Sequence, residues 1–408
     1  MDLESSPHTH GTPRMIHPTR RRLLASAAGL VLPAAAQAQD SLRLGVLTPL
    51  TGAGSFDGPR MLKAMQAVAT DINAAGGLLG RPIELVVEDD ETNPEAAVRA
   101  AHKLVDVDRV PVIMGTWASA VTTAVAPVCW ESKTFLTTVS GADSITHLPH
   151  NGYLIRTQPN NELQATSHAK FIIRHGAKRV FILSIQAPFT EPTQRYLNET
   201  LTPAGITVAG SLIYDKDKTS YRSEVDQALK TKPDLIYLNG YAPDVAVVLR
   251  DLFRAGYDGA RFTQSYALTS KSLADLPKEV TQGVITAQPS ADVDSPAYAA
   301  AAKRLGEAAP DSYEAQATDW ISIVALTIAA AKQATGSALR DNVRKVTNSN
   351  GQKVFTAVDG LVALKQGAEI KYEGASGPCV FTDIGDITSC RFRFNEADNG
   401  AFKLLEVA

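Results

Sequence analysis

A helix is expected to begin among small, hydroxyl-bearing residues that directly follow an apolar strand. The strand covers residues 110–114, and the junction after it reads Gly115-Thr116-Trp117-Ala118-Ser119. A helix start offers free backbone amides and the positive end of the helix dipole, and together with the Ser119 hydroxyl these groups suit a carboxylate. Ser119 could also serve as a simple helix cap. Trp117 could form a wall of the site or pack in the core.

A second loop of small residues follows the next predicted strand, 134–138. It reads Thr138-Val139-Ser140-Gly141-Ala142, and its small side chains would let a ligand approach the backbone. Both loops leave the carboxyl ends of neighbouring parallel strands, so we expect them to lie side by side. We therefore predict a ligand site where the two loops meet, with a carboxylate bound near Ser119.

Three other patterns suggest chemistry without completing a motif. The glycines of residues 52–58 approach a dinucleotide fingerprint, but the third glycine falls one residue late and the acidic run 88–91 lies too far on. That acidic run also lacks the spacing of a calcium loop. A proline between His147 and His150 argues against a helical zinc pair.

Catalytic motifs are missing from the sequence as well. It contains no Cys-x-x-Cys, Gly-x-Ser-x-Gly or phosphate-binding P-loop pattern. We therefore expect no enzyme activity, no metal and no cofactor. An exported oxidoreductase is the competing hypothesis, and it predicts a bound cofactor that absorbs light.

Composition and charge limit the classes of partner that the protein can have. The chain has 408 residues, of which 44% are hydrophobic and 20% charged, which leaves room for two globular domains. The formal net charge is -3, and no Lys/Arg block follows the N-terminal region. Nucleic acid is therefore not an expected partner.

The first forty residues read as a signal peptide. Arginines at 20–22 and two leucines precede the apolar run 25–32, and Ala36-Gln37-Ala38 follows. A basic region, a short apolar region and a small-x-small site define a secretory signal, and the adjacent arginines suggest the twin-arginine route. We expect cleavage near Ala38 and a periplasmic protein, with translation starting at Met1 or Met15.

Export permits disulfides, and two of the three cysteines flank a predicted hairpin. Cys379 and Cys390 enclose two strand-like runs, 380–382 and 387–389. We predict a disulfide between them, which would contribute roughly 3 kcal/mol to stability. Cys129 lies in a helical stretch and is interpreted as a small buried residue.

Strand-like and helix-period segments alternate along the remaining chain, which is typical of parallel βαβ layers. One series runs from strand 42–47 to strand 134–138, and a second from strand 180–184 to strand 283–287. The fold class is therefore α/β, with two doubly wound α/β lobes. A helical tract over 296–346 is expected to pack back onto them. Two such sheets present their loops to a shared cleft, where ligands bind.

Several motifs, in order, make the chain similar to the leucine/isoleucine/valine-binding protein family of type I periplasmic solute-binding proteins. They are Pro49-Leu50-Thr51-Gly52, residues 71–77, Asp89-Asp90, Gly240-Tyr241, residues 374–378, Phe381 and Gly385-Asp386. The resemblance implies a Venus-flytrap fold with a three-crossover hinge near Arg156, Ala287 and Tyr372. It divides the exported chain into 40–156 plus 287–371, the N-lobe, and 157–286 plus 372–408, the C-lobe.

The resemblance also implies roles for individual residues. Ser119 and the loop of Ser140, Gly141 and Ala142 would hold the ligand carboxylate. Phe189 and Tyr241 of the second lobe would close over the ligand.

One departure from the family pattern concerns Tyr266. Amino-acid binders of the family carry an acidic residue at this place, which pairs with the ligand ammonium. A buried ammonium without a counter-charge costs several kcal/mol. Either another acid such as Asp57 or Asp244 reaches the ligand, or the ligand has no α-ammonium and Tyr266 contacts it directly.

The function implied by the resemblance is that of the substrate-binding component of an ABC transporter. Such a protein would bind an amino acid or a related small carboxylate between its lobes and deliver it to permease subunits. Aromatic and aliphatic carboxylates and amides are included among the ligands. A ligand-sensing periplasmic receptor is the alternative, and in either case we expect a monomer.

Overall fold

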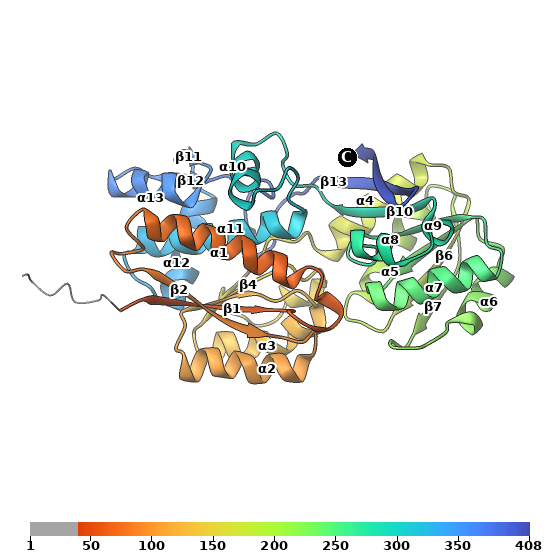
Figure 1. The fold of residues 1–408 in the computed structure, drawn as a ribbon, viewed down its shortest axis with the longest axis horizontal. Coiled ribbons are helices and arrows are strands. Elements are labelled where there is room, and N and C mark those ends of the chain that lie inside the picture. The colour runs from red at the N-terminus through yellow and green to blue at the C-terminus, as the bar shows by residue number, and fades with distance from the viewer. Residues whose placement is uncertain (1–39) are drawn as a thin grey trace, which may run out of the picture. The chain divides into compact units, whose positions relative to one another are not determined.

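A computed structural model describes residues 40–408 (Figure 1). The predicted signal peptide, residues 1–38, lies outside the described residues, together with its cleavage site and the two candidate start residues. Within residues 40–408, no helix is long and apolar enough to cross a membrane.

The first sheet has five parallel strands in the order β2-β1-β3-β4-β5. Helices α2 and α3 cover one face, and α1 covers the other (Figure 1). The elements are β1 (Leu42–Thr48), η1 (Gly52–Gly54), α1 (Gly58–Ala74), β2 (Ile83–Asp89), α2 (Pro94–His102), η2 (Lys103–Val107), β3 (Val112–Gly115), α3 (Ser119–Glu131), β4 (Phe135–Thr138), η3 (Asp143–Ile145) and β5 (Leu154–Arg156). Every residue of β3, β4 and the edge strand β5 is buried, as expected for a parallel sheet covered on both faces.

The second sheet has seven strands in the order β14-β13-β10-β9-β8-β6-β7. Strands β6 to β10 run parallel, and β13 and β14 add an antiparallel edge. The elements are α4 (Asn161–Arg174), β6 (Arg179–Ile185), α5 (Thr190–Leu201), β7 (Thr207–Tyr214), α6 (Arg222–Lys230), β8 (Leu235–Asn239), α7 (Ala242–Arg254), β9 (Ala260–Gln264), α8 (Ser270–Asp275), α9 (Lys278–Thr281), β10 (Val284–Pro289), β13 (Phe392–Asp398) and β14 (Ala401–Val407).

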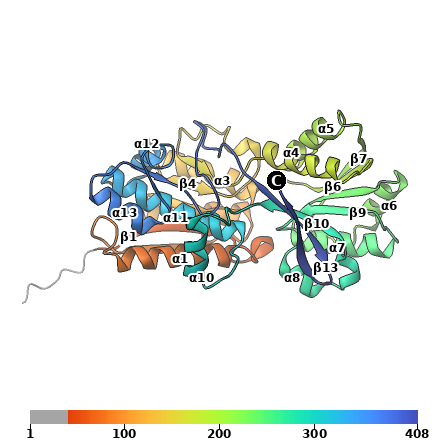
Figure 2. The same cartoon turned by 90° about the horizontal axis from the view of Figure 1, so that it is seen from above.

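The segment between β10 and β13 returns to the first sheet, where α11 packs against α1. Its elements are α10 (Pro296–Leu305), α11 (Ser312–Ala331), α12 (Gly336–Thr347), β11 (Gln352–Val354), α13 (Ala357–Lys365) and β12 (Ile370–Tyr372). Figure 2 shows β13 beside β10, whereas α12 and α13 lie with α1. The chain therefore passes between the sheets three times, and the predicted two-lobed α/β fold is confirmed. The predicted lobe boundaries in the sequence stay a prediction.

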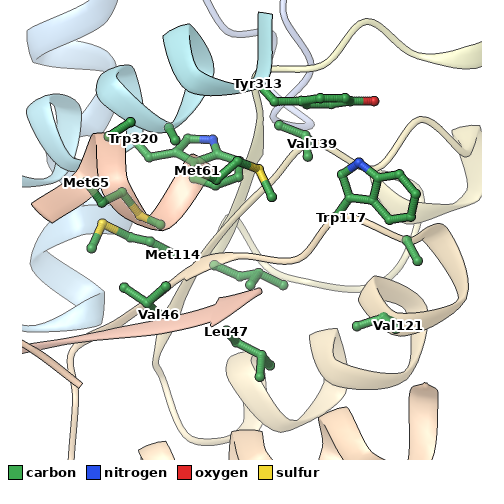
Figure 3. Close-up of a cluster of buried hydrophobic side chains, with 14 of the residues drawn as sticks. Val46, Leu47, Met61, Met65, Met114, Trp117, Val121, Val139, Tyr313 and Trp320 are labelled. Carbon is green, nitrogen blue, oxygen red and sulfur yellow. The ribbon is translucent and has the colours of Figure 1, made fainter. Parts of the chain in front are cut away.

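A continuous apolar core lies under the carboxyl ends of the first sheet (Figure 3). Met61 of α1, Met114 of β3 and Trp320 of α11 are fully buried in it. Burial removes the apolar surface of each such side chain from water, which contributes about 1.5–3 kcal/mol to the stability of the fold. Trp117 and Tyr313 lie in the same cluster, so the core directly supports the loop after β3.

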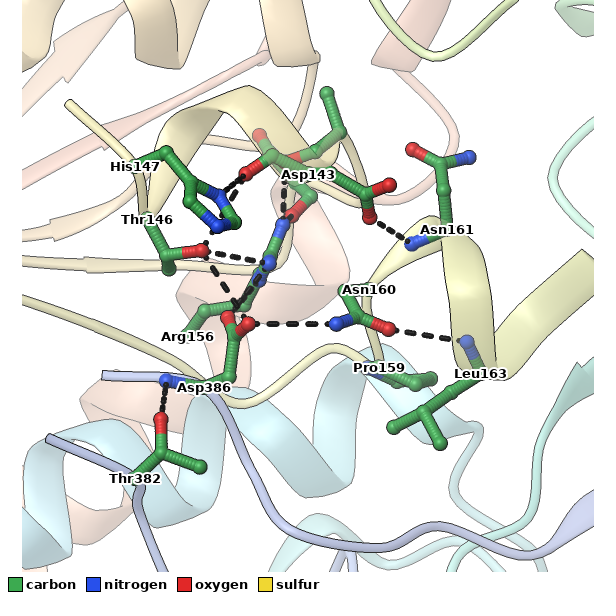
Figure 4. Close-up of polar contacts among 12 residues, drawn as sticks. Asp143, Thr146, His147, Arg156, Pro159, Asn160, Asn161, Leu163, Thr382 and Asp386 are labelled. Atoms are coloured by element: carbon green, nitrogen blue, oxygen red, sulfur yellow. Dashed lines mark hydrogen bonds and ion pairs between the residues drawn. The ribbon is translucent and has the colours of Figure 1, made fainter. Parts of the chain in front are cut away.

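A buried ion pair joins the first and third crossovers (Figure 4). The Arg156 guanidinium, at the end of β5, donates to Asp386 through Nε at 2.9 Å and through Nη2. It also donates to the carbonyl oxygens of Ser140, at 3.2 Å, and of Ala142, at 2.6 Å. Burial lowers the pKa of Arg156, and the charge of Asp386 opposes that shift. One guanidinium thus fixes two crossovers and the loop after β4.

The predicted disulfide is not formed in this structure, in which Cys379 and Cys390 both carry free thiols. The two predicted strands reduce to a single bridge between Phe381 and Ile387. The Cys379 thiol faces the buried carboxylate of Asp319, at 3.7 Å, while that of Cys390 faces the Arg391 carbonyl, at 3.0 Å. The hairpin spacing placed the cysteines near each other, but their side chains have other partners.

Replacing Asp386 with Asn should destabilise the protein by about 3–5 kcal/mol, because it leaves the Arg156 charge buried without a counter-charge. Urea unfolding checks this value against Asp383→Asn, which changes an exposed carboxylate in the same turn. Equal free energies of unfolding for the two variants would contradict the role of the ion pair.

Candidate functional site

The loop after β3 turns sharply at a glycine. Gly115 has φ +125°, and a Cβ there would lie 2.0 Å from the carbonyl oxygen of Leu47. The next residue, Thr116, also has a positive φ, +33°, which is strained for a side chain branched at Cβ. This turn brings Trp117 and Ser119 to the edge of the sheet, and α3 begins at Ser119.

A network of buried hydroxyls holds the loops after β3 and β4 together. The Thr122 hydroxyl contacts those of Thr116, at 2.7 Å, Thr138, at 3.2 Å, and Ser140. Thr138 donates to the Thr116 carbonyl at 2.9 Å, and Ser140 donates to the Trp117 carbonyl at 2.9 Å. Because each hydroxyl both donates and accepts, the loops have a fixed spacing without any charge.

These loops form one side of a small cavity to which both sheets contribute. Its volume is about 30 Å³. It is lined by Trp117, Ser119, Val139, Gly141, Gln158, Asn161, Gln164, Phe189, Tyr241, Gln264, Tyr266 and Tyr313. The set contains five aromatic side chains and four side-chain amides, but no Asp, Glu, Lys or Arg.

Six of the residues predicted from the sequence meet at this cavity: Trp117, Ser119, Gly141, Phe189, Tyr241 and Tyr266. Ser140 and Ala142 do not line the cavity but contact residues that do. The Ser140 hydroxyl belongs to the buried network, and the Ala142 amide donates to Ser119 Oγ at 3.2 Å. Asp57 lies outside this cavity, and Asp244 is occupied by the Tyr221 hydroxyl and the Asp217 amide.

Sequence reasoning missed the amides and one tyrosine. Gln158, Asn161 and Gln164 come from the first crossover and the start of α4, and Tyr313 comes from α11. Polar residues at a helix start are common, so their types gave no signal. The run Asn160-Asn161-Glu162 at the start of α4 is typical of an ordinary helix cap, and the Asn160 side chain does cap that helix.

The aromatic rings pack on one another around Trp117. Its ring centroid lies 5.1 Å from that of Tyr241, 5.7 Å from Tyr266 and 6.5 Å from Tyr313. Phe189 packs edge-on against Tyr241 at 5.8 Å. Since a cavity of about 30 Å³ holds little more than water, a ligand must separate these rings to enter.

Several polar groups facing the cavity have unused hydrogen-bonding capacity. Within residues 40–408, the buried Trp117 Nε1 has no acceptor and Asn161 Oδ1 has no donor. Ser119 Oγ accepts from Ala142, so its own proton can be donated to a ligand. Burial raises the pKa of the Tyr266 and Tyr241 hydroxyls, which keeps both neutral and able to donate. The site can therefore offer several neutral donors to an anion.

The motifs that suggested other chemistry have structural roles. Asp89 accepts hydrogen bonds from the Leu50 amide, at 2.9 Å, and the Thr51 hydroxyl, at 2.6 Å, and thereby holds the glycine-containing loop after β1. His150 is buried, with Nε2 3.2 Å from the Thr146 carbonyl. In the described part of the chain, no three acidic, His or Cys side chains gather as a metal site would require.

Comparisons with known proteins extend these observations. A family model described as periplasmic binding protein matches residues 41–385. The leucine-, isoleucine-, valine-, threonine- and alanine-binding protein of Pseudomonas aeruginosa is 25% identical over 381 residues, which cover 92% of this chain and 95% of that protein.

Two solved structures share the fold. A leucine-binding protein from Thermotoga maritima has a TM-score of 0.76 at 21% identity, covering 90% of this chain and 98% of that one. A solute-binding protein from R. palustris in complex with benzoate has a TM-score of 0.73 at 18% identity, covering 90% and 96%.

Replacing Thr122 with Val should lower the free energy of unfolding by about 1–3 kcal/mol, because the variant keeps the shape but removes the hub of the hydroxyl network. The control is Thr123→Val on the same helix, whose hydroxyl contacts only the Ser119 carbonyl, at 2.9 Å. Urea unfolding measures both variants, and an equal loss in both would mean that the network does not fix the loops.

Proposed function

The chain belongs to the periplasmic binding protein family, and from this we propose that it is the substrate-binding component of an ABC transporter, capturing a small carboxylate for delivery to a membrane permease. The predicted signal peptide is consistent with a periplasmic location. The same proposal includes a monomeric protein without a cofactor.

The observation that carries the proposal is the composition of the Trp117 cavity. Loops from both sheets surround it, its walls are aromatic, and its polar groups are neutral. Small-molecule sites typically combine such walls with a few convergent polar groups. A cavity whose lining contains no Asp, Glu, Lys, Arg, His or Cys side chain is better suited to binding than to catalysis.

We assign the ligand carboxylate to the start of α3. Ser119 Oγ and Trp117 Nε1 can both donate there, and the Gly141 amide makes no hydrogen bond within residues 40–408. The helix start adds the positive end of its dipole. Together these groups replace the hydration of an anion without requiring a buried lysine or arginine.

The ligand at this cavity is proposed to lack an α-ammonium group. Tyr266 stands in the wall, and no carboxylate lines the cavity, so a bound ammonium would lose its hydration without gaining a counter-charge. An aromatic or aliphatic carboxylate avoids that cost and packs against Trp117 and Tyr241. Benzoate, the ligand in one structural neighbour, belongs to this class.

Ser119→Ala should weaken binding of benzoate about tenfold, because it removes one charge-assisted donor. Isothermal titration with benzoate, 4-hydroxybenzoate and 4-methylvalerate measures the affinity. Ser144→Ala is the control, since Ser144 is an exposed serine in the neighbouring turn.

Two results would overturn this proposal. If none of the three carboxylates binds, the proposed carboxylate-binding function is refuted. Tighter binding of leucine than of 4-methylvalerate, lost in Ser119→Ala, would show that this cavity accepts an ammonium.

A further inference from the structure

One side-chain oxygen at the Trp117 cavity takes no part in the hydrogen bonding of the fold. Asn161, the first residue of α4, lines that cavity and is only 4% exposed. Within residues 40–408, its Oδ1 atom is buried and has no hydrogen-bond partner. Buried polar atoms in folded proteins nearly always have a partner, so a free one at a candidate binding site indicates a contact with the ligand.

The nitrogen of the same amide determines which atom is free. Asn161 Nδ2 donates to the Thr193 hydroxyl of α5 at 2.7 Å and, at 3.5 Å, to the Phe189 carbonyl oxygen. A carbonyl oxygen can only accept, so the atom beside Phe189 is the nitrogen and the free atom is the oxygen. Reversing the amide would place two acceptors against each other. Asn161 therefore offers the cavity an acceptor and not a donor.

The backbone of Asn161 is held in place as well (Figure 4). Its amide donates to Asp143 Oδ1, in the loop after β4, at 2.9 Å. The preceding residue, Asn160, caps α4 by accepting from the Leu163 amide at 3.0 Å. Because the side chain and the backbone are both fixed, Oδ1 stays at the cavity, where an incoming ligand can meet it.

Asn161 and the proposed carboxylate position lie within reach of one small ligand, because Asn161 and Ser119 line the same cavity of about 30 Å³. The groups differ in kind. Ser119 Oγ and Trp117 Nε1 can donate to a ligand, whereas Asn161 Oδ1 can only accept. A benzoate ion carries acceptors alone, so it would satisfy the donors and leave the Asn161 oxygen buried without a partner.

We propose that the Trp117 cavity selects carboxylates that also carry a hydroxyl group, and that Asn161 recognises this hydroxyl by accepting a hydrogen bond from it. The inference rests on the carboxylate-binding function proposed above and narrows the class of ligand. Asn161 thereby determines specificity, because a site that leaves a buried polar atom unpaired discriminates against the ligand that lacks the matching group.

A hydroxyl group fits Asn161 better than an ammonium group does. A hydroxyl has a single proton to donate, and the free oxygen of Asn161 satisfies it. An ammonium group has three protons and a full charge, and the lining of the cavity contains no carboxylate to neutralise that charge. The neutral amide oxygen therefore favours hydroxy acids over amino acids.

The test compares benzoates that carry either a hydroxyl group or a fluorine atom at ring position 3 or 4. Fluorine is close to a hydroxyl in size but has no proton to donate. Isothermal titration should show the hydroxyl form binding at least about tenfold more tightly than the fluoro form at one of these positions. In Asn161→Leu this ratio of affinities should fall to about one. Asn198→Leu, at an exposed asparagine of α5, is the control and should keep the ratio.

The ratio separates hydroxyl recognition from a structural role of Asn161, because a distorted cavity would weaken both members of a pair. If benzoate binds but neither hydroxyl form is preferred over its fluoro form, hydroxyl recognition is refuted while the carboxylate-binding function stands. If benzoate and all of its derivatives fail to bind, that function is refuted and this inference with it. A preference that survives in Asn161→Leu would refute the assignment to Asn161. Circular dichroism verifies folding, and Asn161→Ala takes the place of Asn161→Leu if the leucine variant does not fold.

Discussion

Arg156 brings a full positive charge into the protein interior, and Asp386, 230 residues later in the chain, neutralises it. The same guanidinium holds the carbonyl oxygens of Ser140 and Ala142. The position of the loop after β4 is therefore tied to the first and third crossovers. A movement of the lobes that shifts either crossover must act on this loop, because a buried arginine cannot give up its partners at low cost. The loop beside the Trp117 cavity and two of the three crossovers thus share one polar centre.

Tyr266 and Tyr313 line a second, larger cavity of about 460 Å³ as well as the Trp117 cavity, and charge is distributed unevenly between the two. On the Trp117 side, the lining groups are neutral and consist mainly of hydroxyls, amides and aromatic rings. On the other side, Asp57, Arg60, Asp311 and Arg393 line the wall. Tyr266 and Tyr313 therefore separate a neutral environment from a charged one. An acidic residue in place of Tyr266 would bring a charge into the neutral cavity and change the class of ligand it selects.

The sequence predicted those parts of the site that follow from the local order of strands, loops and helices. Trp117, Ser119 and Gly141 were found because each follows an apolar strand, and parallel strands end at one edge. Phe189, Tyr241 and Tyr266 were placed through the family resemblance. Gln158, Gln164 and Tyr313 reach the cavity only through the crossovers and through α11, and no local pattern encodes such long-range placement. The disulfide is not formed in this structure for a related reason: residue spacing does not encode the contact with Asp319, which orients the Cys379 thiol.

Carboxylate binding beside Trp117, between the lobes, can be observed directly by fluorine NMR. The chain has three tryptophans, Trp117, Trp130 and Trp320, so protein labelled with 5-fluorotryptophan should give three fluorine resonances, with Trp117→Phe identifying one of them. Saturation with benzoate should shift the Trp117 resonance strongly and leave that of Trp130 in place. If benzoate raises the melting temperature while the Trp117 resonance stays unchanged, the binding site lies elsewhere and the assignment to Trp117 is contradicted.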